Sequence, residues 1–271
     1  MPVKEDSIAA IICAAGSSIR MGGVKKEYLL LEPFPSGGEK LTVLGAAFSA
    51  FASCPKIGLI IIAVPPGSKD GENAARACLP PEHRLSKNSA GDKQERILFV
   101  PGGSTRRASV YNALKQLEQY HPSHVLIHDG ARPWIKKSLI EKVINTTIRY
   151  GAAIPVLPMS ETPKELEIEL KTELPSEMIK QNLSSKEIPV FIKHHLRRRT
   201  IYIAQTPQGF KFPEMLEAHK KAAEREAREN FKYTDDAEVW GEFIGQVAVV
   251  PGDPENKKIT FPGDLIKPVQ K

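Results

Sequence analysis

A loop of small residues, followed by two cations, ends the first apolar run of the chain. The run at 8–14 leads into four small residues: Ala14, Ala15, Gly16 and Ser17. Small side chains let the backbone approach a phosphate chain so that its N–H groups point at anionic oxygens, and Arg20 and Lys26 add charge-assisted contacts. The loop therefore predicts a phosphate site, although a tight strand-to-helix turn would explain the same glycine.

Two common nucleotide-binding motifs do not fit this loop. A dinucleotide-binding fingerprint needs GxGxxG and an acidic residue at the end of the second strand, but the second apolar run ends at Val64 and Pro65. The Walker A patterns GxxxxGKS and GxxxxGKT are also missing. The loop therefore points to a nucleotide site of another class.

A carboxylate follows a later apolar run. Asp129 comes directly after 124–128, at the expected end of a strand. A carboxylate in that place can hold Mg²⁺ against the phosphates of a nucleotide. The same residue would also serve as the N-cap of the helix that follows, and the residues alone leave both interpretations open.

The elements that must position these loops alternate between strand and helix. Strands are expected at 8–14, 58–64, 97–100, 124–128, 152–157 and 247–250, and helices at 43–52, 109–120, 137–150 and 214–230. This rhythm predicts an α/β domain with a mostly parallel sheet, whose ligands bind at the carboxyl ends of the strands. The stretches 32–40, 65–95 and 161–192 are polar or rich in Pro and Gly, and are interpreted as insertions.

Composition narrows the class of ligand. The 271 residues carry a formal charge of +6, with a basic cluster around Arg197–Arg199, which favours polyanionic partners. No aromatic-basic interleaving of the nucleic-acid-binding kind is present, so small phosphates are favoured over nucleic acid. No apolar run is long enough to cross a membrane. Three cysteines without CxxC spacing indicate neither a disulfide framework nor a zinc site, and favour the cytoplasm.

Segments spread along almost the whole chain match one protein family in order. They are Ala14–Gly16 with Arg20-Met21 and Lys26–Leu29, Gly102–Val110, His128–Pro133, Pro158–Lys164, Gln205–Phe210, Thr234–Ala237 and Asn256–Thr260. Together they resemble the 2-C-methyl-D-erythritol 4-phosphate cytidylyltransferase family of the non-mevalonate isoprenoid pathway. The resemblance implies transfer of CMP from CTP to methylerythritol phosphate, with pyrophosphate leaving.

The resemblance also implies an architecture. It is a Rossmann-like, three-layer nucleotidyltransferase fold of the α/β class, with a mostly parallel sheet and a protruding β-arm. One domain would span residues 1–271, with the arm at 160–200. In the family this arm reaches into the partner subunit of a homodimer and helps to form the substrate site, so a homodimer through 161–192 is expected.

The resemblance assigns roles to individual residues. The catalytic cations around the α-phosphate are Arg20, Lys26 and Lys258. The nucleotide-binding residues are Ala14, Ala15, Gly16, Ser17, Gly103, Ser104, Arg106, Ser109, Asp129 and Gly130. The substrate-binding residues are Thr162, Arg198 and Thr206. Asp129 is also the expected ligand of Mg²⁺ or another divalent cation.

The chain departs from the family pattern at several positions. Ser18 stands where a second loop glycine is usual, Lys25 replaces a proline, and Gly130 replaces an alanine. Three rival functions remain: a cytidylyltransferase for ribitol 5-phosphate, a non-catalytic nucleotide-binding regulator, and a nucleic-acid-binding protein. The joint presence of Arg20, Lys26 and Lys258 with the carboxylate speaks against the regulator, because binding alone would not require the whole set.

Overall fold

The computed structural model describes residues 7–18, 21–31, 40–67, 69–84, 97–167, 190–229 and 231–265. The chain folds as two compact units. The main unit comprises Met1–Pro155 and Gln205–Lys271, and the arm unit comprises Val156–Ala204.

A mixed sheet forms the centre of the main unit, with strand order β10-β5-β9-β4-β1-β2-β3. The strands are β1 (Ile8–Cys13), β2 (Ile57–Val64), β3 (Ile97–Pro101), β4 (His124–Asp129), β5 (Ala152–Pro158), β9 (Gln208–Lys211) and β10 (Ala248–Pro251). β1 is parallel to β2 and β4, and β2 is parallel to β3, whereas β9 is antiparallel to β4 and β5. The carboxyl ends of β1 to β4 therefore lie at one edge of the sheet.

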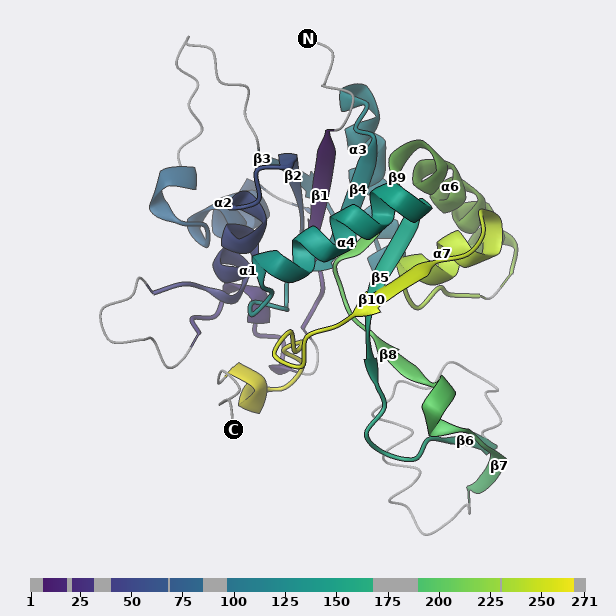
Figure 1. Ribbon diagram of the computed structural model, residues 1–271. Coiled ribbons are helices and arrows are strands. Elements are labelled where there is room, and N and C mark those ends of the chain that lie inside the picture. The colour runs from purple at the N-terminus through teal and green to yellow at the C-terminus, as the bar shows by residue number, and fades with distance from the viewer. Residues whose placement is uncertain are drawn as a thin grey trace. The chain divides into compact units, whose positions relative to one another are not determined.

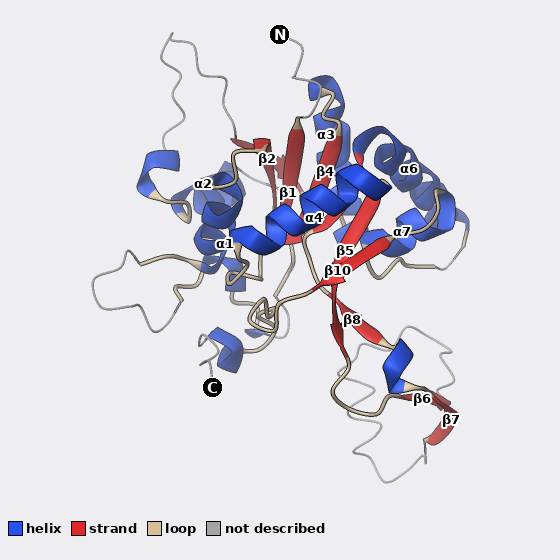
Figure 2. Cartoon of the chain, in the orientation of Figure 1, coloured by secondary structure: helices blue, strands red, loops and turns tan. Residues whose placement is uncertain are grey.

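Helices cover both faces of this sheet (Figure 1, Figure 2). They are α1 (Val43–Ala52), α2 (Lys69–Ala77), α3 (Arg106–Leu117), α4 (Lys137–Tyr150), α6 (Phe212–Arg228) and α7 (Asp236–Phe243). Within β1, Ala10 and Ile12 belong to the buried cluster of α1 and α4, while Ala9 and Ile11 belong to that of α3 and α6. Both faces of the strand are apolar because both are covered, which confirms the predicted three-layer α/β fold.

Most elements lie where the sequence predicts them, and α1 and α4 have the predicted bounds. The helix predicted at 109–120 instead begins at Arg106, and 118–120 form a 3₁₀ turn. Thr105 sets this start because its hydroxyl accepts a hydrogen bond from the Ala108 N–H at 3.0 Å. The predicted start is three residues late because the apolar periodicity begins inside the helix.

Three elements of the main unit were not predicted. The interpretation of 65–95 as an irregular insertion is wrong for α2, where Arg76 and Glu72 pair at 2.9 Å one turn apart. Residues 32–39 and 85–96, which belong to two of the expected insertions, lie outside the described residues. The strand β9 and the helix α7 also escaped prediction, since neither has a long apolar run.

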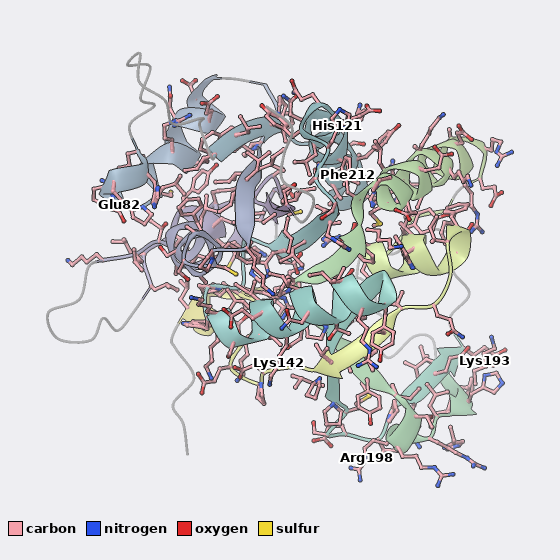
Figure 3. The ribbon with its side chains drawn as sticks, turned by 45° about the horizontal axis from the view of Figure 1, so that its top comes forward. Glu82, His121, Lys142, Lys193, Arg198 and Phe212 are labelled. Carbon is pink, nitrogen blue, oxygen red and sulfur yellow. The ribbon has the colours of Figure 1, made fainter. Side chains whose placement is uncertain are left out.

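The arm unit is made of short antiparallel pairs. β6 (Lys164–Glu167) pairs with β7 (Phe191–His195), and β8 (Tyr202–Ala204) pairs with the last three residues of β5. Figure 3 shows Lys193 and Arg198 with their side chains at the surface of this unit. Residues 168–189, most of the stretch expected to be an arm insertion, lie outside the described residues. Across the described parts of both units, no helix is long and apolar enough to span a membrane.

Candidate active site

Asp129 ends β4 and lies beside the loop that follows β1. Its neighbour across the sheet is Cys13, and the Gly130 N–H donates to the Cys13 carbonyl oxygen at 2.9 Å. A Cβ atom on Gly130 would lie 2.9 Å from that same oxygen, so the close approach favours glycine here. The helix that follows, α4, has Lys136 at its N-cap. The alternative interpretation of Asp129 as the N-cap is therefore wrong.

The loop after β3 packs against the loop after β1. A Cβ atom on Gly102 would collide with the Cβ atom of Ala15, so only glycine lets the two loops meet. The Gly103 N–H donates to Ser109 Oγ at 3.0 Å, which ties the loop to the first turn of α3. The N-terminus of that helix, with Ser104 just before it, thus lies beside the first loop.

Three cations surround the Asp129 carboxylate. Arg106 Nε lies 3.1 Å from Oδ1, while Lys258 Nζ and Arg132 Nε lie 3.0 and 3.4 Å from Oδ2. Burial alone would raise the pKa of Asp129, but Arg106, Lys258 and Arg132 hold that pKa well below its usual range. The carboxylate is therefore ionised at neutral pH. Lys258, which the sequence alone would leave as a surface charge, belongs to this cluster.

The chemistry of the donors fits one kind of metal ion. No group of three His, Cys, Asp or Glu side chains that could hold a metal occurs among the described residues. Mg²⁺ is commonly held by one or two carboxylates together with the phosphates of a substrate. The single ionised carboxylate of Asp129 fits a magnesium ion that arrives with a nucleotide, and does not fit a metal caged by the protein alone.

A chain of buried hydrogen bonds fixes the backbone of Asp129. Its N–H donates to Thr206 Oγ1 at 3.1 Å, and the Thr206 hydroxyl contacts His128 Nδ1 at 2.9 Å. His128 Nε2 lies 3.2 Å from the Arg132 carbonyl oxygen, so Nε2 carries the proton and Nδ1 accepts. Burial lowers the pKa of His128 to about 4, which keeps the ring neutral and suited to this role. Thr206, expected at the substrate, holds the carboxylate strand here.

The two glutamines beside Thr206 hold two distant segments at the site. Gln205 Nε2 donates to the carbonyl oxygens of Asp253 and Asn256, at 2.9 and 3.2 Å, in the loop that carries Lys258. Gln208 donates to Asp235 Oδ2 at 2.8 Å and accepts from the Ala237 N–H at 3.0 Å, at the start of α7. One short segment thus brings the chain near 256 and the chain near 236 to the end of β4.

Two residues of the site were missed by the sequence analysis. Asp236 Oδ2 accepts a hydrogen bond from Arg106 Nη1 at 2.7 Å, and its Oδ1 lies 3.3 Å from His219 Nε2. Both side chains are buried. The segment containing Asp236 resembled the family without a role for that residue, and His219 has no sequence pattern that points to a partner. Their pairing becomes visible only where α3, α6 and α7 meet.

The first loop is partly described. Arg20 lies outside the described residues, whereas Lys26 begins a 3₁₀ turn at 26–28. The neighbouring Lys25 donates to the Gly16 carbonyl oxygen at 2.5 Å, and so closes the loop where the family has proline. Ser18 has a φ of +52°, which explains why glycine is usual there. The next α-helix of the described residues begins only at 43, so a simple strand-to-helix turn does not account for this loop.

The remaining substrate residues lie in the arm unit. Thr162 is exposed, and Arg198 donates from Nη1 to the Ser160 carbonyl oxygen at 2.7 Å. This bond ties Arg198 to the segment between β5 and β6, and both neighbouring arginines are exposed as well. The sequence expectation for these two residues stays a prediction.

Comparison with known proteins places the chain in a family. The sequence model described as "IspD: 2-C-methyl-D-erythritol 4-phosphate cytidylyltransferase" matches residues 8–175 and 171–268. The chain belongs to this family. The matched ranges contain the segments by which the sequence resembles the IspD family, including the loop of Lys258.

Named relatives and solved structures agree with this membership. The chain is 32% identical to the "Bifunctional enzyme IspD/IspF" of Bartonella tribocorum, over 96% of the chain and 54% of the relative. It is 35% identical to the protein of that name from Bradyrhizobium sp. BTAi1, over 96% and 55%. The chain therefore spans about half the length of these curated IspD relatives.

Solved IspD-family structures share the fold. The 4-diphosphocytidyl-2C-methyl-D-erythritol synthase of Anaerococcus prevotii superposes with a TM-score of 0.68 at 26% identity, covering 96% of this chain and 93% of the other. The 2-C-methyl-D-erythritol 4-phosphate cytidylyltransferase of Thermus thermophilus gives 0.63 at 28% identity, covering 96% and 95%.

Proposed function

We propose that the protein transfers CMP from CTP to 2-C-methyl-D-erythritol 4-phosphate and releases pyrophosphate, as a step of the non-mevalonate isoprenoid pathway. The observation that carries this proposal is the ionised Asp129 with three cations around it, at the carboxyl edge of the sheet and beside a loop of small residues. Membership of the IspD family supports the same substrates.

The reaction asks the protein to position and to stabilise charge. An oxygen of the methylerythritol phosphate group attacks the α-phosphorus of CTP in line, and the bond from that phosphorus to pyrophosphate breaks. Negative charge grows on the equatorial oxygens and on the leaving group, and fixed cations stabilise it. We assign this work to Lys258 and Lys26, together with Arg20.

No side-chain nucleophile is needed. The thiol nearest to Asp129 is Cys13, and burial raises its pKa to about 12, so it stays protonated and unreactive at neutral pH. His128 is held neutral between two hydrogen bonds and has no free proton acceptor. Both observations favour direct transfer between the two substrates.

The remaining assignments follow the loops. The backbone at 14–17 would hold the phosphates of CTP. The base and ribose would be bound by the loop after β3 and the start of α3, through Gly103, Ser104, Arg106 and Ser109. Asp129 and the neighbouring Gly130 would face Mg²⁺ or another divalent cation, which when bound neutralises the phosphates of CTP. Thr162 and Arg198 would receive the methylerythritol phosphate, with Thr206 behind Asp129.

We also propose a homodimer formed through the arm unit. Four large apolar side chains of β7 and β8 are 48–64% exposed in the single chain: Phe191, Ile192, Tyr202 and Ile203. Exposed apolar groups gathered on short strands suit burial against a second copy. A fully active monomer in sizing experiments would refute the homodimer.

The three cysteines are free thiols, which supports a location in the cytoplasm.

The test is pyrophosphate release with CTP and Mg²⁺. Methylerythritol 4-phosphate and ribitol 5-phosphate are offered as separate acceptors. Turnover with the first alone is expected. Turnover with the second alone would keep the CTP chemistry and overturn the acceptor, while no turnover with either would favour a nucleotide-binding regulator.

A further inference from the structure

A buried carboxylate and a buried imidazole lie behind Arg106, on the side away from Asp129. Asp236 is 1% exposed and starts α7, while His219 is fully buried in α6. These two helices pack side by side (Figure 1), with Ala218 and Val239 in a shared apolar cluster. A buried charge of this kind is costly unless a partner compensates it.

Arg106 joins two carboxylates through different nitrogens. Nε contacts Asp129 at 3.1 Å, and Nη1 contacts Asp236 at 2.7 Å. Because the guanidinium is planar and rigid, two anchors on separate nitrogens fix the orientation of its plane. Asp129 shares its oxygens with two further cations, whereas Arg106 is the only arginine or lysine of the described residues that pairs with Asp236. Asp236 is therefore the carboxylate that pairs with Arg106 and with no other arginine or lysine of the described residues.

His219 stands behind this anchor. Its Nε2 lies 3.3 Å from Asp236 Oδ1, and neither atom makes a well-aligned hydrogen bond within the described residues. The ring stacks near Tyr111 of α3, with centroids 6.4 Å apart and planes at 19°. The imidazole thus lies against Oδ1, the carboxylate oxygen that is not bonded to Arg106.

We propose that Asp236, backed by His219, is a positioning residue that holds Arg106 at the nucleotide site. The proposal rests on the proposed function, in which CTP and its cation take Asp129 as a partner. Such a ligand would remove one of the two anchors of Arg106. Asp236 is the anchor that stays, so the guanidinium keeps its place while the nucleotide is bound.

The test compares Asp236→Asn and His219→Gln with Glu226→Gln. The control breaks a largely buried ion pair that also involves α3, since Glu226 of α6 contacts Arg107 at 2.6 Å, with side chains 15% and 10% exposed. We expect Asp236→Asn to lower kcat/KM for CTP about 10- to 100-fold, the range for one charge-assisted hydrogen bond. In the same variant, KM for the acceptor should stay unchanged. His219→Gln should lower kcat/KM for CTP by less than Asp236→Asn does. Glu226→Gln should leave kcat/KM for CTP within about twofold, the change expected when no reacting group is displaced.

A double-mutant cycle separates positioning from folding. If Asp236 acts through Arg106, adding Asp236→Asn to Arg106→Gln should cost no further kcat/KM. An equal loss in both backgrounds, or an equal loss in Glu226→Gln, would overturn the proposal. If Asp236→Asn fails to fold, His219→Gln carries the same cycle.

Failure of the proposed function would be seen separately, as absence of turnover in the unaltered chain. In that case the affinity of each variant for CTP, measured by calorimetric titration in the presence of Mg²⁺, tests the positioning role of Asp236. The proposal then expects the variants of Asp236 and His219 to bind CTP more weakly than Glu226→Gln does. Equal affinity in all of them would overturn it.

Discussion

Lys258→Met should separate catalysis from stability. The ammonium lies 3.0 Å from Asp129 Oδ2, and its side chain is 37% exposed. Solvent screens a pair of this exposure, so its loss should cost no more than about 1 kcal/mol of unfolding free energy. For a chain of this size, that is a shift of about 2–4 °C in Tm.

The expected effect on turnover is much larger. If Lys258 stabilises charge that develops at the α-phosphorus, its removal should resemble the loss of one transition-state donor. That loss is about 3–4 kcal/mol, or about 100- to 1000-fold in kcat. The carboxylate of Asp129 should remain ionised, because Arg106 and Arg132 still lower its pKa when the lysine is removed.

Continuous pyrophosphate release and calorimetric unfolding measure the two quantities on the same samples. Lys257→Met is the matched control, since this neighbouring lysine is exposed in the same loop. It should leave kcat within about twofold, as expected for a surface position. A kcat for Lys258→Met within about threefold of the unaltered chain, less than a single donor supplies, would refute the assignment.

Two further predictions concern stability. The lowered pKa of Asp129 means that its ionised form stabilises the fold above about pH 4, and that this contribution is lost as the pH falls through the folded pKa. Urea unfolding should therefore show Asp129→Asn to be less stable than the unaltered chain at neutral pH, with a gap that narrows in acid; a constant gap would contradict this. Ser18→Gly should change the unfolding free energy by less than about 1 kcal/mol, because relief at φ +52° offsets the lost contacts of Oγ with Glu27 and the Lys26 N–H. Ser18→Ala keeps the strained backbone and loses both contacts, so thermal unfolding should place it about 1 kcal/mol below the glycine variant; an alanine variant as stable as the glycine variant would count against this reasoning.

The parts of the fold that sequence predicted are those governed by local pattern. β1 and β2 are apolar on both faces because helices cover both faces, and each strand is therefore visible in the sequence as a nearly continuous apolar run. β9 could not be found in this way, since Phe210 is its only large apolar residue. Its place depends on a tertiary contact: a Cβ atom on Gly209 would collide with Thr147 of α4.

The residues of the site also fall into those that a local sequence pattern predicts and those that it does not. The first loop and Asp129 follow predicted strands, so their proximity could be inferred from parallel topology alone. Lys258 reaches the carboxylate from more than a hundred residues away, and only the family resemblance indicated it. Asp236 contacts both Arg106 and His219 where three helices pack, and no local pattern of the sequence records these long-range contacts.

The net charge of the cluster around Asp129 favours the binding of an anion. Asp129 pairs with Arg106, Arg132 and Lys258, and Asp236 pairs with Arg106, so two ionised carboxylates and three cations leave one positive charge. A cluster that served folding alone would gain little from such an excess, because an unbalanced charge in a partly buried cluster adds no ion pair and still has to be desolvated. Arg106 and Lys258 also keep 28% and 37% of their side chains exposed, so both remain within reach of a ligand. CTP and a second phosphate would bring more negative charge than the cluster can balance, and a divalent cation beside Asp129 is the natural source of the rest.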